Sequence, residues 1–274
     1  MIKILVLAVL SLCTATANLF ATEWNQWGGS SVRNNVSTAK NIPTEWNPGD
    51  FDTASGDWKP DTSENIVWVA PLGSQSYGNP VIASGKVFVG TNNGHGWLER
   101  YPAEVDLGCL LAFNVEDGSF LWQDSSEKLP TGRVHDWPLQ GICCSPLVEG
   151  DRLWYVTSRG EVKCLDTEGF RDGENDGPFT DEKVTEKNEA DVIWVVDMMK
   201  QFGVSQHNMC SCSVTGTGDS LFVITGNGVD EGHISLPNAD APSFLCIDKH
   251  NGSLLWSDNS PGANVLHGQW SSPS

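Results

Sequence analysis

A thirteen-residue pattern that occurs twice decides the fold. Residues 110–122 read LLAFNVEDGSFLW, and residues 244–256 read FLCIDKHNGSLLW. In each copy two apolar runs flank an Asp-Gly or Asn-Gly pair, and such pairs favour the tight turns of β-hairpins. The second run ends on a tryptophan, Trp122 or Trp256. The pattern therefore predicts an antiparallel hairpin with a large aromatic side chain at a fixed point of its second strand.

The hairpin is the second half of a larger repeat. Two further short apolar runs, separated by a Gly-containing turn, precede it, and a less regular copy of the whole unit ends on Trp194. A fourth unit opens with WSSP at residues 270–273. One four-stranded sheet cannot bury both of its faces, whereas sheets packed side by side around an axis can. We therefore predict an all-β fold, a β-propeller of four-stranded antiparallel blades.

The propeller is predicted to be incomplete in this chain, with about three full blades and the start of a fourth. Closed propellers have roughly four to eight blades. Residues 66–69 read IVWV and resemble the outer strand of one more blade, whose other strands this chain does not supply. Insertions at 91–108, 170–191 and 228–242 are expected to project from one rim.

The chain divides into three predicted parts. Residues 1–17 are expected to be a secretory signal peptide, with Lys3, an apolar run and an A-x-A site at Ala15 and Ala17, and cleavage after Ala21 as the other possibility. Residues 18–60 form an irregular lead-in that we expect to wrap the propeller edge, and residues 61–274 form the partial propeller. The signal predicts an exported protein of the periplasm or cell surface.

The charge limits the classes of partner. With 16 basic and 35 acidic residues, the formal net charge is −19. Nucleic acids and anionic membranes require a basic surface, so we expect no nucleic-acid partner. No apolar stretch reaches the length of a transmembrane helix, and the mature protein is expected to be soluble or peripheral to the outer membrane.

The repeat resembles a known family. Ala112 and Cys246 precede the spacing Gly-x-x-x-Trp at 118–122 and 252–256, which is similar to the PQQ repeat of quinoprotein alcohol dehydrogenase-like propellers. The lead-in, with QWGG at 26–29, resembles the start of bacterial PQQ-binding-like β-propeller repeat proteins. The family includes alcohol dehydrogenases that bind PQQ and calcium, and a cofactor-free propeller of the outer-membrane barrel assembly machinery. Fold alone does not choose between them.

The resemblance also assigns roles to residues. It implies that Trp122, Trp194 and Trp256 pack one blade against the next. It further implies a cofactor-binding place for Cys143 and Cys144, because the dehydrogenases hold a vicinal disulfide against PQQ at the start of an innermost strand. A pair of buried thiols, one of them bonded to a neighbouring blade, is the other interpretation.

Two further groups have metal-binding chemistry. Asp172, Glu174 and Asp176 alternate as in a calcium loop, although Lys183 stands at the twelfth position where a bidentate Glu is expected. A solvated acidic insertion explains the same residues. Three histidines precede innermost strands and could share a site around the axis: His135, His207 and His267.

Two functions fit these observations. The first is a non-catalytic scaffold or binding module of the cell envelope that takes protein partners or a small ligand at the propeller face. The second is a PQQ- and calcium-dependent dehydrogenase of alcohols or sugars. The first needs only the repeats, the signal and the acidic surface, and is favoured because no catalytic residues can be placed by motif.

Overall fold

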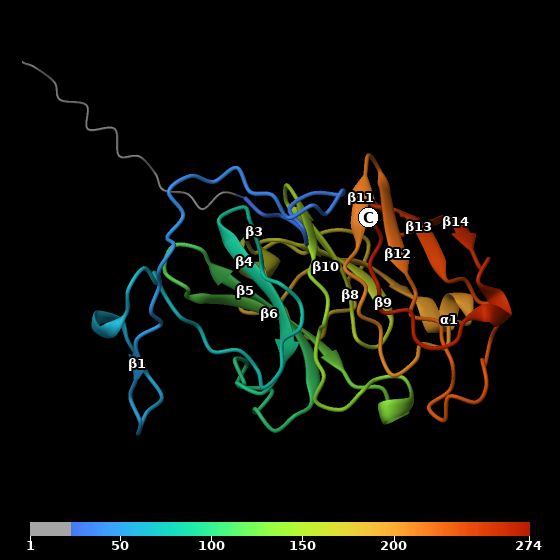
Figure 1. The fold of residues 1–274 in the computed structure, drawn as a ribbon, viewed down its shortest axis with the longest axis horizontal. Helices are drawn as coiled ribbons and strands as arrows, with labels where there is room; N and C mark the ends of the chain where they lie inside the picture. Colours follow the sequence, from blue (N-terminus) through green and yellow to red (C-terminus); the bar gives the residue numbers. More distant parts are fainter. Residues whose placement is uncertain (1–22) are drawn as a thin grey trace, which may run out of the picture.

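The structure is a computed structural model that describes residues 23–274. Three four-stranded antiparallel sheets stand side by side and fan around a common axis (Figure 1), and a two-stranded ribbon precedes them. The ribbon pairs β1 (Asp50–Phe51) with β2 (Trp58–Lys59). The first blade holds β3 (Val81–Ala83), β4 (Lys86–Asn92), β5 (Leu107–Asn114) and β6 (Phe120–Glu127). The second holds β7 (Leu147–Glu149), β8 (Arg152–Val156), β9 (Glu161–Asp166) and β10 (Val192–Asp197). The third holds β11 (Thr215–Thr217), β12 (Ser220–Ile224), β13 (Phe244–Asp248) and β14 (Leu254–Asp258).

The repeated hairpin has the same register in each blade. Trp122 pairs with Ala112 across β6 and β5, and Trp256 pairs with Cys246 across β14 and β13. Gly118, in the first of these turns, has a φ of +71°, which a residue with a Cβ rarely adopts. The small partner leaves room on the sheet surface for the indole ring. The all-β blade architecture predicted from the sequence is confirmed.

The tryptophans of the outer strands join neighbouring blades. The Trp68 indole N–H donates to Val115 O at 2.9 Å. In the same way Trp122 donates to the carbonyl of Thr167 at 3.0 Å, and Trp194 to that of Lys249 at 3.1 Å. Each ring also covers a turn glycine of the next blade, since a Cβ on these glycines would lie within 3.0 Å of the ring: Gly118, Gly169 and Gly252. We call the contact surface between two neighbouring blades a seam. Trp122 and Trp194 lie in equivalent seams, as predicted.

Trp256 occupies the matching position in β14 but lies open. Its side chain is 48% exposed, because no further described sheet covers β14. Residues 66–69 also lack a neighbouring strand. They were expected to form the outer strand of one more blade, but they form no strand here. A strand needs a hydrogen-bonded neighbour, and the described residues offer none at that place. Trp68 nevertheless packs as the other seam tryptophans do.

The lead-in follows a different path from the predicted one. It was expected at the propeller edge, but residues 24–33 cross the innermost strands near the axis, and the β1–β2 ribbon stands apart from the blades (Figure 1). Trp24 forms an antiparallel bridge with Ile82, Asn25 exchanges hydrogen bonds with Val148, and Gln26 accepts from Thr215. Short innermost strands leave their inner backbone groups without a partner, and this segment satisfies some of them.

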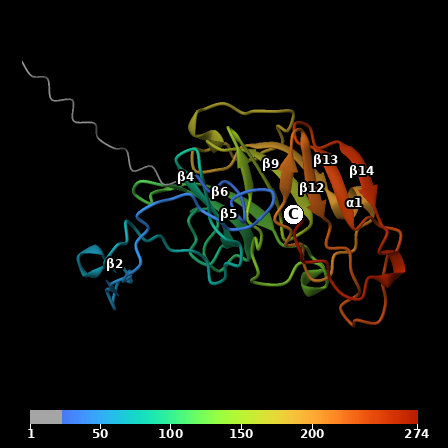
Figure 2. The same cartoon turned by 45° about the horizontal axis from the view of Figure 1, so that its top comes forward.

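The insertions do not project from one rim. The chain reverses at each strand of an antiparallel blade, so connections between second and third strands lie at the opposite end from those between third and fourth strands. Residues 93–106 and 225–243 are of the first kind, whereas 167–191 joins β9 to β10 and is of the second kind. Figure 2 shows residues 167–191 at the top and residues 225–243 at the lower right.

Helical structure is limited to short pieces. The helix α1 (Met198–Phe202) begins at Asp197, whose side chain accepts from Lys200 N–H, and ends at Gly203 in the left-handed region. Single 3₁₀ turns occupy Pro60–Thr62, Gly132–Val134, Gly169–Arg171 and Gly262–Asn264. Across residues 23–274, no helix has the length and apolarity needed to cross a membrane. The predicted signal peptide and its cleavage sites lie outside the described residues.

Candidate functional site

Four equivalent residues surround the axis where the innermost strands begin. Each stands two positions before the Asn or Ser that opens its repeat. They are Tyr77, Cys143, Ser211 and Trp270. All four line one cavity, which we call the axial pocket. The propeller symmetry brings these residues together although they are far apart in the sequence.

The floor of the axial pocket is a chain of hydrogen bonds from blade to blade. Ser145 N–H donates to Ser213 Oγ at 2.9 Å, and Ser213 N–H donates to Ser272 Oγ at 2.9 Å. The Ser145 hydroxyl donates to Asn79 O at 2.8 Å. The second bond repeats the first one blade further on, so the Asn or Ser that opens each repeat joins neighbouring blades at the axis.

The axial pocket combines four aromatic rings with small polar side chains. Its volume is about 540 Å³, which suits a small-molecule ligand. Asn79, Gln140 and Asn208 supply amide groups. The aromatic and thioether side chains that line it are Trp27, Tyr77, Trp137, Trp270 and Met209. Among the described residues, none that lines this pocket is Asp, Glu, His, Lys or Arg.

Arg33 fastens the lead-in to the pocket region. Its guanidinium lies 4.8 Å from the centre of the Trp27 ring and donates to the carbonyls of Trp27, Ser213, Val214 and Pro273 at 2.7 to 3.1 Å. All three guanidinium nitrogens are therefore hydrogen-bonded to backbone carbonyl oxygens. Arg33 fixes Trp27 in the pocket wall, with four of its five N–H groups donated to backbone carbonyls.

Cys143 and Cys144 lie as the repeat predicts, at the start of the second blade. Cys143 lines the axial pocket, whereas Cys144 is buried with its Sγ 3.2 Å from Val156 O. Both are thiols in the structure, with Cys143 Sγ 3.5 Å from Gly141 O. Burial raises the pKa of each thiol to about 12, so both stay protonated at neutral pH. The cofactor-binding role of this pair stays a prediction.

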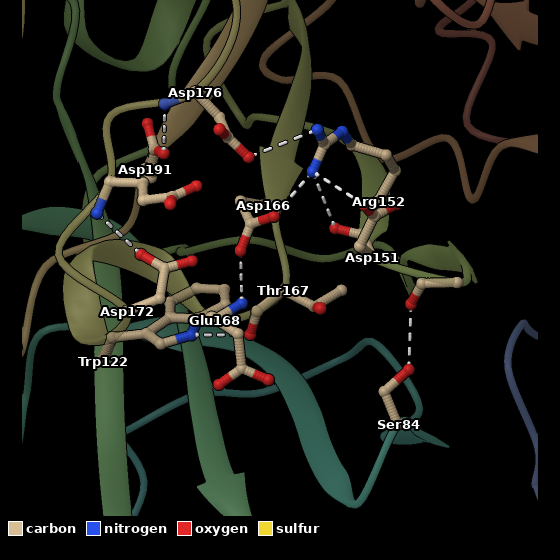
Figure 3. Close-up of polar contacts among 12 residues, drawn as sticks. Ser84, Trp122, Asp151, Arg152, Asp166, Thr167, Glu168, Asp172, Asp176 and Asp191 are labelled. Atoms are coloured by element: carbon tan, nitrogen blue, oxygen red, sulfur yellow. Dashed lines mark hydrogen bonds and ion pairs between the residues drawn. The ribbon is translucent and has the colours of Figure 1, made fainter.

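The predicted calcium residues lie at the other end of the second blade. Figure 3 shows Asp176 directed to Arg152, with Oδ2 3.3 Å from Nη2, while Asp172 Oδ1 accepts from Glu174 N–H at 2.9 Å. The structure does not gather Asp172, Glu174 and Asp176 into one group of ligand atoms. An ion there would have to compete with Arg152 for Asp176. The calcium site stays a prediction, and it is remote from the axial pocket.

Asp191, beside this loop, is a buried carboxyl with an unusual titration. Its Oδ2 accepts from Asp176 N–H at 2.8 Å, and its Oδ1 has no partner among the described residues. Burial raises the pKa of Asp191 to about 6, which the hydrogen bond from Asp176 partly opposes. The folded state therefore holds this proton more tightly than the unfolded state, whose Asp pKa is about 4.

We expect Asp191→Asn to stabilise the protein at pH 7.5 and to have little effect at pH 4. The stability that the protonated carboxyl provides is present below pH ~4 and is lost as the pH rises through about 6. The asparagine keeps the shape without the charge, so the gain at pH 7.5 should be about 1 to 2 kcal/mol. Urea unfolding of both proteins at the two pH values measures it. An equal difference at both values would contradict the assignment.

Two of the three predicted histidines come together. His207 and His267 lie with ring centroids 4.5 Å apart, and His233 completes a group whose ligand atoms are all within 4.8 Å of one another. His135 is outside it, with Nε2 3.4 Å from Ser205 Oγ, so its inclusion was wrong. His233 was not predicted from the sequence because it lies inside an insertion, away from the repeat positions. Trp27, Trp137 and Trp270 were likewise not predicted as pocket residues.

The chain is similar to several solved structures. A quinohemoprotein alcohol dehydrogenase from Comamonas testosteroni aligns with a TM-score of 0.51 and 10% identity, over 86% of this chain and 27% of its own. A europium-containing methanol dehydrogenase aligns with a TM-score of 0.46 and 9% identity, over 86% and 31%. BamB from Moraxella catarrhalis aligns with a TM-score of 0.31 and 13% identity, over 71% and 49%.

These alignments cover only part of each solved structure. The chain spans about a quarter of the length of the alcohol dehydrogenase. No protein-family model and no curated protein matches the sequence. At such low identity the likeness concerns the fold alone, and the first alignment supports the arrangement of the blades. The fold of this chain is therefore a β-propeller of four-stranded blades, as in that alcohol dehydrogenase.

Proposed function

We propose that this chain belongs to an exported propeller that acts as a non-catalytic scaffold or binding module in the cell envelope, with the axial pocket as its binding site. The composition of that pocket is the observation that carries the proposal. Four aromatic rings and three amide side chains suit a flat, largely apolar group that also forms hydrogen bonds. Such a group could belong to a small ligand or to a protein partner.

The same composition argues against chemistry by the described residues. A general base must lie within hydrogen-bond reach of the proton that it removes. The hydroxyl groups of the pocket have no carboxylate or imidazole beside them in its lining, and Cys143 remains a protonated thiol because of its raised pKa. Binding is therefore the activity that these side chains support.

The second candidate is a PQQ- and calcium-dependent dehydrogenase of alcohols or sugars. Cys143 beside aromatic rings favours it, since PQQ is a flat quinone. The cofactor also carries three carboxylates, and these require cationic partners. The described lining has no cationic side chain, Arg33 is engaged with backbone carbonyls, and no lining carboxylate is available for calcium. The described residues thus fit the plane of PQQ but not its charge, and we derive no catalytic step.

The proposal is tested by titrating the purified chain with 1,4-naphthoquinone, a flat uncharged probe, while tryptophan fluorescence is followed. We expect saturable quenching, because three tryptophans line the pocket. Ser211→Phe fills the pocket and should weaken binding at least about tenfold. Ser55→Phe, in the exposed β1–β2 turn, is the matched control and should leave binding unchanged.

A parallel titration with PQQ and calcium separates the two candidates. Saturable PQQ binding together with dye reduction by ethanol or glucose would establish the dehydrogenase and overturn the non-catalytic assignment. Quenching by naphthoquinone that Ser211→Phe does not weaken would remove the axial pocket as the binding site. The expected result is pocket-dependent binding of the uncharged probe without turnover.

A further inference from the structure

Three histidines from separate loops of the third blade meet beside the axial pocket. His207 lies between α1 and β11, His233 in the insertion between β12 and β13, and His267 after β14. Their ligand nitrogens lie within 4.8 Å of one another, and the Nε2 atoms of His233 and His267 are 2.9 Å apart. Nitrogens that share a tetrahedral zinc ion are about 3.3 Å apart at Zn–N distances of about 2.0 to 2.1 Å. The group is therefore compact enough to surround one ion.

His207 is oriented as a ligand. It is 1% exposed, and its Nδ1 lies 2.7 Å from Val229 O. An Nδ1–H that donates to this carbonyl leaves the lone pair of Nε2 free, and metal-binding histidines are commonly fixed in this way. With its proton on Nδ1 and a free lone pair on Nε2, this ring is neutral. A neutral ring is the form that binds a metal.

The other two rings are exposed but held in place. His233 and His267 stack with 26° between their planes, and His267 meets the Trp270 ring edge-on at 4.9 Å. Asp230 accepts from Ile234 N–H and thereby closes the turn that carries His233. His233 itself has a φ of +57°, a conformation that is uncommon for a residue with a Cβ. A strained backbone conformation persists only where the surrounding structure holds it in place, and such conformations are frequent at ligand sites.

We propose that His207, His233 and His267 bind one divalent transition-metal ion, with zinc as the reference ion and a coordination position left open. Imidazole ligands suit zinc, copper and nickel, whereas calcium and magnesium prefer oxygen. Three protein ligands leave the fourth position of a tetrahedral ion for water or a ligand. Trp270 contacts His207 and His267 and also lines the axial pocket, so the ion lies at the rim of that pocket.

Zinc titration of the untagged chain tests this site. Metal-free protein is titrated calorimetrically with Zn²⁺, and bound zinc is counted after dialysis. We expect one zinc ion per chain in the wild type, and at least about tenfold weaker binding in His233→Ala and in His267→Ala. Both residues are exposed, so these variants should fold normally, as circular dichroism would verify. His95→Ala, outside the group, is the matched control and should bind as the wild type does.

Cobalt supplies an independent readout of geometry. Co²⁺ bound by three imidazoles and a water should give the intense visible absorption of a tetrahedral site, and this band should vanish in His267→Ala. Absence of zinc binding by the wild type, or binding that both alanine variants retain, would overturn the proposal. This result is independent of the naphthoquinone titration, which depends on the axial pocket and not on the histidines.

Discussion

Trp122→Ala is expected to lower the free energy of unfolding by about 3 to 5 kcal/mol. The ring is fully buried in the seam between the first two blades, packs on Phe88 with centroids 5.7 Å apart, and covers Gly169. Its loss leaves a cavity that neighbouring sheets cannot close without moving, and Thr167 O loses its donor. Urea unfolding followed by circular dichroism measures the change.

Trp256→Ala is the matched control for this prediction. Trp256 occupies the same place in its hairpin, but its side chain is 48% exposed. About half of its surface is already exposed and its removal leaves no enclosed cavity, so we expect a smaller loss, of about 1 to 2 kcal/mol. Similar losses for the two variants would show that seam packing does not hold the blades together. Such a result would remove the physical basis of the propeller assignment.

Asp124→Ala is expected to destabilise the protein by about 3 to 5 kcal/mol. Asp124, on β6, accepts from Lys163 Nζ at 2.9 Å and from the hydroxyl of Tyr155, both on the second blade. All three side chains are buried. Without the carboxylate, the Lys163 ammonium and the Tyr155 hydroxyl remain buried without a charged acceptor. The free energy of leaving these two groups unpaired exceeds that of the lost contact.

A double variant distinguishes an unpaired charge from simple loss of packing. Asp124→Asn with Lys163→Met removes both charges and keeps an oxygen that can accept from Tyr155. We expect most of the stability to return, because a neutral buried pair carries no desolvation penalty of that size. If the double variant were as unstable as Asp124→Ala, the ion pair would not be the cause. Asp52→Ala, which breaks an exposed ion pair with Lys59, should leave the unfolding midpoint unchanged.

Local pattern was sufficient to predict the blades. Turn chemistry at Asp-Gly and Asn-Gly, the apolar runs and the spacing to Trp122 and Trp256 are properties of short segments. Hairpin register depends on turn length and on which side chains face inward, so segments of this length carry it. The start of each innermost strand was also visible, and it placed Cys143 near the axis.

Long-range contacts could not be predicted in the same way. The path of the lead-in depends on Arg33 reaching the carbonyls of Ser213 and Pro273, which are 180 and 240 residues away in the chain. No local pattern encodes such a contact. The rim that carries residues 167–191 follows from the direction of β9, which only the assembled blade makes evident.

The sequence by itself determined the repeat, the four-stranded blade and the tryptophan that ends each hairpin, because these follow from side-chain period and turn geometry over about a dozen residues. Only the tertiary structure decided which side chains meet at the axis and that His233 joins His207 and His267. Those groupings depend on how loops from different strands converge once the sheets have packed. That convergence is a property of the packed blades and not of any one segment.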